Sequence, residues 1–143
     1  MTVRVERSMT VSASPERVWD FIADPEQRAR PISVVEDWEV ESETESTWFL
    51  SLPIPFVDRT IRVETEDVER REPEFVRFVG RSKVMKVQGE HELEPTDEGG
   101  TRLTNRFIVD GKLPGVERFF KRNLDDEMRN LEQALRDELE VEA

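Results

Sequence analysis

The stretch Ser12–Gln27, which reads SASPERVWDFIADPEQ, carries the clearest helix signal near the start of the chain. Ser14 is a good helix cap, and Pro15 follows at the first helical position, where a missing N–H costs nothing. Val, Trp, Phe and Ile then recur at i, i+3 and i, i+4 spacing and give one apolar stripe. An Asp-Pro-Glu turn interrupts this pattern, and Pro31 follows soon after. The stretch therefore predicts two short helices in succession.

Runs of strand character lie on both sides of this helical stretch. Before it, Thr2–Val11 alternates apolar and polar residues, except that Arg7 falls on the apolar side. After it, six further runs reach about Asp110: ISVVEDWEVES, ESTWFLSLPIPF, DRTIRVETEDVER, EFVRFVGR, KVMKVQGEHELEP and TRLTNRFIVDG. Short links such as TDEGG join them, which indicates hairpins and an antiparallel sheet.

The last segment changes to a helical period. No breaker follows Gly111 and Pro114, and one helical face is marked by Val116, Phe119, Phe120, Leu124, Met128, Leu131, Leu135 and Leu139. The element order predicts an α+β fold in which a curved seven-stranded antiparallel sheet wraps around a long C-terminal helix. The two short helices after the first strand then close one end. At 143 residues, we expect a single domain over 1–143.

The chain resembles the START-like superfamily, also called SRPBCC or helix-grip, which includes polyketide cyclases/dehydrases and an accessory protein of carbon monoxide dehydrogenase. The resemblance rests on VSASPERVWDFIADPEQ, with its polar cap, Pro, acidic residue, Val-Trp and apolar pair, and on the Leu-rich helix after a Gly/Pro turn. It implies an internal apolar cavity between sheet and helix that holds a lipid, a polyketide or a similar molecule. Members range from carriers to cyclases to co-chaperones, so the resemblance indicates where a site lies and leaves the reaction open.

The charge balance narrows the partners. The formal net charge is −12, and neither a long basic run nor a basic helix is present to displace counterions from phosphates. We therefore expect neither a nucleic acid nor an anionic membrane as the main partner. An acidic chain with few lysines and no cysteine is similar to halophilic proteins, in which the charge is a solvation adaptation. The alternative is an acidic surface for a basic partner.

Cofactor and membrane signals are missing from the sequence. Without Cys, and with His91 as the single histidine, the usual zinc ligand sets cannot form. No phosphate loop or dinucleotide fingerprint occurs, so we expect no metal and no cofactor. The first residues are charged, and no apolar run approaches the ~20 residues of a membrane span. These features predict no membrane insertion and a cytoplasmic location.

Flat aromatic and flexible sulfur side chains suit a cavity for apolar ligands. The candidates for its lining are Trp38, Trp48, Phe75, Met85, Phe107, Phe119 and Phe120. Ordinary core packing is the alternative for each of them. The segment SLPIPFVD bends at two prolines, and its residues Ile54, Phe56 and Val57 form a candidate cavity mouth or a contact surface for a homodimer.

Three polar residues are candidates for contact with a ligand. His91 shares its strand parity with Met85, which places it toward the cavity, where an imidazole can act as acid or base. The alternative is a strand histidine near the sheet end. Asn105 can bind a ligand carbonyl or satisfy a buried backbone group. Arg59 can bind a carboxylate head group, or lie solvated near its hairpin.

Binding or carriage of a hydrophobic small molecule without chemistry is the function that these features favour. One alternative is a cyclase/dehydratase-like enzyme that uses His91 with Asn105 or Arg59. The chain has no Tyr, which is a common cavity acid in the family's enzymes, and this weighs against catalysis. A further alternative is an accessory or interaction module.

Overall fold

A sheet of seven strands forms the centre of the computed structural model, which describes residues 2–53 and 60–139. The strand order is β1-β7-β6-β5-β4-β3-β2, and every neighbouring pair is antiparallel. The strands are β1 (Thr2–Val11), β2 (Val35–Val40), β3 (Glu45–Leu50), β4 (Ile61–Arg71), β5 (Phe75–Arg81), β6 (Met85–Pro95) and β7 (Thr101–Gly111). The helices are α1 (Pro15–Ile22), α2 (Pro25–Ala29) and α3 (Pro114–Leu139). The predicted fold class is confirmed.

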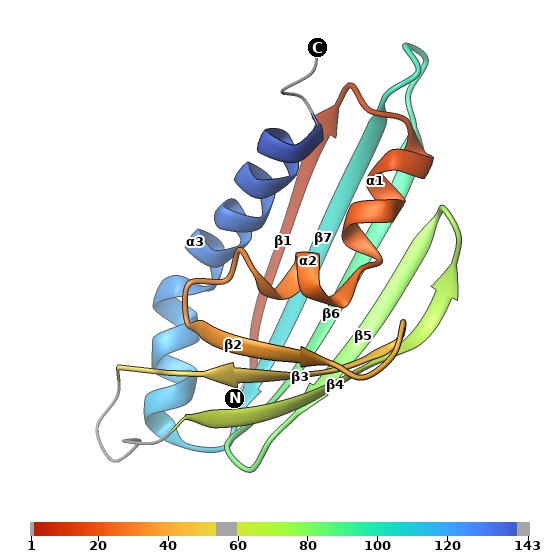
Figure 1. Cartoon of the computed structure of the whole chain (residues 1–143). Helices are drawn as coiled ribbons and strands as arrows, with labels where there is room; N and C mark the ends of the chain where they lie inside the picture. The colour runs from red at the N-terminus through yellow and green to blue at the C-terminus, as the bar shows by residue number, and fades with distance from the viewer. Residues whose placement is uncertain (1, 54–59, 140–143) are drawn as a thin grey trace.

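All three helices lie over the concave side of the sheet, and Figure 1 shows α3 running beside it with α1 and α2 in front. The long helix packs against β1 and β7, while α1 packs against β6 and α2 against β2 and β3. Each helix therefore covers a different part of the sheet. No helix in the described ranges is long and apolar enough to cross a membrane.

The two short helices begin where the sequence places their caps. The Ser14 side chain accepts a hydrogen bond from the backbone N–H of Arg17 at the start of α1. Asp24 does the same for Glu26, at 2.9 Å, and so starts α2 at Pro25 instead of extending α1. The cap residue inside the ADP sequence thus explains why neither helix becomes long.

Alternation along the central strands places apolar side chains on the concave face. In β6, for example, Met85, Val87 and Leu93 are buried. One row breaks this pattern: the register pairs Arg7 with Asn105 and Asn105 with His91 across β1, β7 and β6. We call these three residues the polar row.

Arg7 occupies the apolar parity of β1 because α3 supplies its partners. Its Nε donates to Glu132 Oε2 at 2.9 Å and its Nη1 donates to Asp125 Oδ1 at 3.1 Å. The hydrogen bond to Glu132 is the main cause that raises the pKa of Arg7. Glu132 is itself buried, so the pair joins the edge strand β1 to the long helix.

Close packing of the sheet depends on a glycine opposite a phenylalanine. Gly89 on β6 pairs in register with Phe78 on β5. A Cβ atom at position 89 would overlap the Phe78 ring. The ring therefore lies directly against the backbone of β6, on the concave side next to the polar row.

We predict that Arg7→Met destabilises the protein by about 1–3 kcal/mol, because it leaves the buried Glu132 carboxylate without its ion-pair partner. Urea unfolding at pH 7 measures the loss. Arg4→Met is the matched control, since Arg4 lies on the same strand outside this ion pair, and it should change stability by less than about 0.5 kcal/mol. Adding Glu132→Met to Arg7→Met should recover most of the loss. Equal effects of Arg4→Met and Arg7→Met would contradict this role of the ion pair.

Candidate functional site

An apolar cavity of about 40 Å³ lies between the sheet and α3. Its wall consists of Ile32, Val34, Val35, Trp48, Leu50, Val63, Met85, Val87, Phe107, Val109, Phe120, Leu124, Glu127, Met128 and Leu131. The volume has room for no more than a few water molecules, whereas pockets for drug-sized ligands measure roughly 300–1,000 Å³. A ligand of that size would therefore require the lining side chains to move.

Four of the predicted lining residues meet at this cavity. Trp48 reaches it from β3, Met85 from β6, Phe107 from β7 and Phe120 from α3. These four come from elements that are far apart in the sequence. Their convergence gives the cavity a wall of aromatic and sulfur groups.

Three other predicted residues lie elsewhere. Phe75 is on the outer face of the sheet, where the guanidinium groups of Arg71 and Arg77 lie 4.8 and 5.2 Å from its ring centroid. Trp38 is half-buried near α2, and its indole N–H donates to Glu26 Oε1 at 3.1 Å. Phe119 is half-buried beside Phe120, with ring centroids 5.1 Å apart.

The predicted cavity mouth is not placed by this structure. Ile54, Phe56 and Val57 lie outside the described residues, and so does Arg59. Their roles in binding or dimerisation stay predictions.

Glu127 is the one charged residue in the cavity wall, and its carboxylate already has partners. Its Oε1 accepts from the Ser33 hydroxyl at 2.8 Å and from the Asn130 amide at 2.8 Å. The backbone N–H groups of Ser33 and Val34 also donate to it, at 3.2 and 3.4 Å. Glu127 thus ties α3 to the loop before β2 and presents little free polarity to the cavity.

His91 and Asn105 form a buried pair next to the cavity and are not part of its wall. His91 Nδ1 lies 2.7 Å from Asn105 Oδ1. Because a carbonyl oxygen can only accept, Nδ1 is the donor, and Nε2 of the neutral ring carries a free lone pair. Burial, followed by the charge of Arg28, lowers the pKa of His91 to about 3, although the hydrogen bond to Asn105 opposes this.

Four rings connect the cavity wall to His91. Phe78 lies 5.6 Å from Trp48 and 6.0 Å from Phe107, measured between ring centroids, and both of those residues line the cavity. Phe78 is also stacked on His91 at 6.0 Å, with 19° between the planes. Phe78 therefore separates the apolar cavity from the polar row by a single side chain.

A buried ion pair lies above these rings. Arg28 of α2 donates through Nη2 to Asp67 Oδ1 of β4 at 2.6 Å, and Arg70 donates to the other oxygen at 2.6 Å. The Arg28 guanidinium carbon lies 4.8 Å from the centroid of Phe78. Burial is the main cause that lowers the pKa of Arg28, and the charge of Asp67 opposes this effect.

Arg28, Asp67 and Glu127 were not among the candidates from the sequence. Asp67 carried a signal, because it continues the inward parity of Ile61 and Val63 in an otherwise apolar row. Arg28 carried none, since a five-residue helix has no period that distinguishes a buried face. Its partner lies 39 positions away in the chain, so only the fold brings the two together.

The curved sheet that grips one long helix defines the chain as a START-like, helix-grip protein, and the solved structures agree. A conserved protein from Geobacillus kaustophilus has a TM-score of 0.76 and 17% identity, and the match covers 95% of this chain and 94% of that one. A START superfamily protein from Mycobacterium smegmatis has a TM-score of 0.75 and 15% identity, covering 98% and 99%. The di-domain ARO/CYC StfQ from the steffimycin biosynthetic pathway has a TM-score of 0.69 and 14% identity, covering 94% and 50%.

The chain belongs to the family described as "Polyketide cyclase / dehydrase and lipid transport", whose model matches residues 2–136. No curated protein matches it. At the level of the family, these findings support the binding of hydrophobic ligands, and the solved structures add the fold.

We predict that the folded protein loses stability between pH 6.5 and pH 4 through His91. In the unfolded chain the imidazole gains a proton below its ordinary pKa of 6.5, whereas in the folded state the pKa is about 3. The unfolded state therefore binds more protons in this window, and stability falls with decreasing pH by up to about 1.4 kcal/mol per unit. Urea unfolding at pH 7 and pH 5 should differ by about 2 kcal/mol from this cause.

The control for this effect is His91→Gln, which keeps an amide donor toward Asn105 and removes the titrating ring. Carboxylates titrate equally in both proteins, so the difference between their pH profiles isolates His91. Parallel profiles for the parent and the variant would show that the histidine is not held neutral.

Proposed function

We propose that the chain binds or carries a hydrophobic small molecule, such as a lipid or a polyketide, in the cavity beneath α3. The apolar character of the cavity wall is the observation that carries this proposal. Its single carboxylate, on Glu127, is already engaged by Ser33, Val34 and Asn130. The family description, which includes lipid transport, supports the same function.

The small volume of the cavity requires that it expand around the ligand. Met85 and Met128 lie in its wall, and unbranched thioether side chains adopt new rotamers easily. Val34 and Ile32 belong to the half-buried loop before β2, which forms the wall away from the sheet centre. Side-chain rotation together with movement of this loop would enlarge the cavity.

A cyclase/dehydratase-like activity is the second candidate, and the free Nε2 lone pair of His91 is the observation that favours it. A ligand hydroxyl that donates to Nε2 would lie where a proton could be removed. The His91→Gln variant tests this. Turnover of a bound polyketide-like compound by the parent and not by the variant would establish catalysis, whereas unchanged ligand recovered from both would contradict it.

We predict that the neutral fluorescent probe N-phenyl-1-naphthylamine binds the protein with an increase in fluorescence. Val34→Trp should weaken this binding at least about tenfold, because the larger ring fills a cavity of about 40 Å³. Val40→Trp is the matched control, since Val40 lies on β2 with 48% of its surface exposed and does not line the cavity. Equal affinities for the two variants would place the probe elsewhere.

Native mass spectrometry provides a second test. Protein purified without denaturation should retain a hydrophobic compound, and the retained mass should be less abundant in Val34→Trp than in Val40→Trp. Binding should also raise the melting temperature, because a ligand at 100 times its Kd stabilises the folded state by about 2.7 kcal/mol. Absence of both the retained mass and any thermal shift with lipid extracts would contradict the proposed function.

A further inference from the structure

Four buried polar atoms beside the cavity have no hydrogen-bond partner among the described residues. They are Nε and Nη1 of Arg28, Nδ2 of Asn105 and Nε2 of His91. The exposed fractions of the three residues are 3%, 0% and 0%. Buried polar groups in native proteins are nearly always paired, and an unpaired one costs about 1–3 kcal/mol. Three residues with this property in one region point to a ligand.

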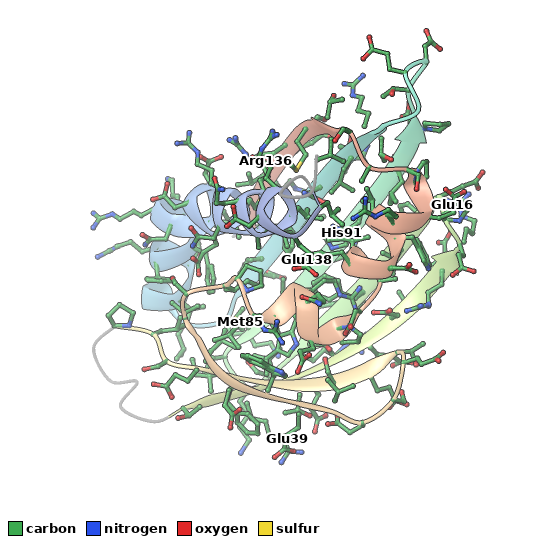
Figure 2. The ribbon with its side chains drawn as sticks, turned by 45° about the horizontal axis from the view of Figure 1, so that its top comes forward. Glu16, Glu39, Met85, His91, Arg136 and Glu138 are labelled. Carbon is green, nitrogen blue, oxygen red and sulfur yellow. The ribbon has the colours of Figure 1, made fainter. Side chains whose placement is uncertain are left out.

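The unpartnered atoms belong to one place in the fold. His91 and Asn105 are neighbours in the polar row, and they lie on the β6 and β7 side of Phe78. Arg28 lies over the same Phe78 ring, and its charge acts on His91. Figure 2 shows His91 beside α1, farther along β6 than Met85, which lies in the cavity wall.

The free atoms are complementary to a carboxyl group. Arg28 and Asn105 offer N–H donors, whereas His91 Nε2 offers an acceptor. A carboxyl group has an oxygen that accepts from the guanidinium and the amide, and in its protonated form a hydroxyl that donates to the imidazole. A guanidinium donor also strengthens the contact, because hydrogen bonds that involve a charged group are stronger than neutral ones.

The existing partners of Arg28 leave it able to bind this group. Asp67 takes up one of its N–H groups and shares its other oxygen with Arg70. Asp24 also attracts the charge of Arg28, but its carboxylate is bonded to the backbone of Glu26. Asp67 thus fixes the guanidinium over Phe78 with the remaining N–H groups available.

We propose that Arg28, Asn105 and His91 form a subsite for the carboxyl group of an apolar carboxylic acid whose chain lies in the cavity. This inference rests on the proposed function and names the class of its ligand. Phe78 is the side chain that such a ligand displaces, because its ring contacts Trp48 and Phe107 of the cavity wall as well as Arg28 and His91. The acid head then replaces the Phe78 ring beneath Arg28.

A competition experiment with matched ten-carbon ligands tests the subsite. Decanoic acid, decan-1-ol and methyl decanoate each displace N-phenyl-1-naphthylamine from the parent protein at pH 7, below their aggregation limits. A purely apolar cavity would prefer the alcohol, because burying an ionised carboxylate costs more than burying a hydroxyl. We expect the acid to bind at least about tenfold more tightly than the alcohol and the ester. An acid that binds no better than the alcohol would overturn the subsite.

Paired substitutions identify the residues responsible. Arg28→Met with Asp67→Asn removes the guanidinium without leaving a buried carboxylate unpaired, and Asn still accepts from Arg70. This double variant should reverse the preference, so that the alcohol binds at least as well as the acid. Arg30→Met is the matched control: Arg30 follows the same helix but is exposed and pairs with Glu26, so the acid preference should persist. Equal preferences in the two variants would exclude Arg28 from the subsite.

The outcomes separate this inference from the proposed function. If all three ligands displace the probe with an alcohol preference, the apolar cavity binds ligands and the carboxyl subsite is wrong. If none displaces it and the probe itself does not bind, both proposals fail. Should the double variant fail to fold by circular dichroism, the acid-to-alcohol ratio of the parent and of His91→Gln still decides, with a lower ratio expected in the variant.

Discussion

One helix cannot cover the concave face of a seven-stranded sheet. A helix with its side chains is about 10 Å across, whereas seven strands at about 4.8 Å spacing span about 29 Å. Accordingly α3 packs on β1 and β7, and the short helices α1 and α2 cover strands that it does not reach. The cavity lies where these covers meet the sheet, which explains why its wall draws residues from both the sheet and α3. A ligand site is therefore a consequence of how the sheet is covered.

Polar contacts fix the covering helices at their margins. Arg7 and Glu132 join β1 to α3, Glu127 joins α3 to the loop at Ser33, and Arg28 with Asp67 joins α2 to β4. Apolar packing has little directional preference, so these bonds determine where each helix sits on the apolar face. They also leave the space between them lined by apolar groups. The fold can then hold a cavity without losing the position of its helices.

The sequence predicted the elements well and the polar contacts poorly. The caps at Ser14 and Asp24, the alternation of the strands and the apolar face of α3 are local patterns, and they produced the right architecture. Arg7 stood out as a break in parity, but its partners on α3 lie more than a hundred residues away. Arg28 had no local signal at all. Phe75 looked like lining because its strand is apolar on both sides, and only the register with Glu92 places it on the outer face.

The electrostatics of the polar row favour binding over catalysis. A general base works best when its pKa lies near the working pH, and burial together with the charge of Arg28 lowers that of His91 to about 3. Such an imidazole is a weak base, and at neutral pH it holds no proton to give as an acid. The same property makes it a good permanent acceptor for a hydroxyl. Arg28, which prevents His91 from gaining a proton, is at the same time a donor for a ligand oxygen, so the two side chains together suit recognition of a polar head better than transfer of its proton.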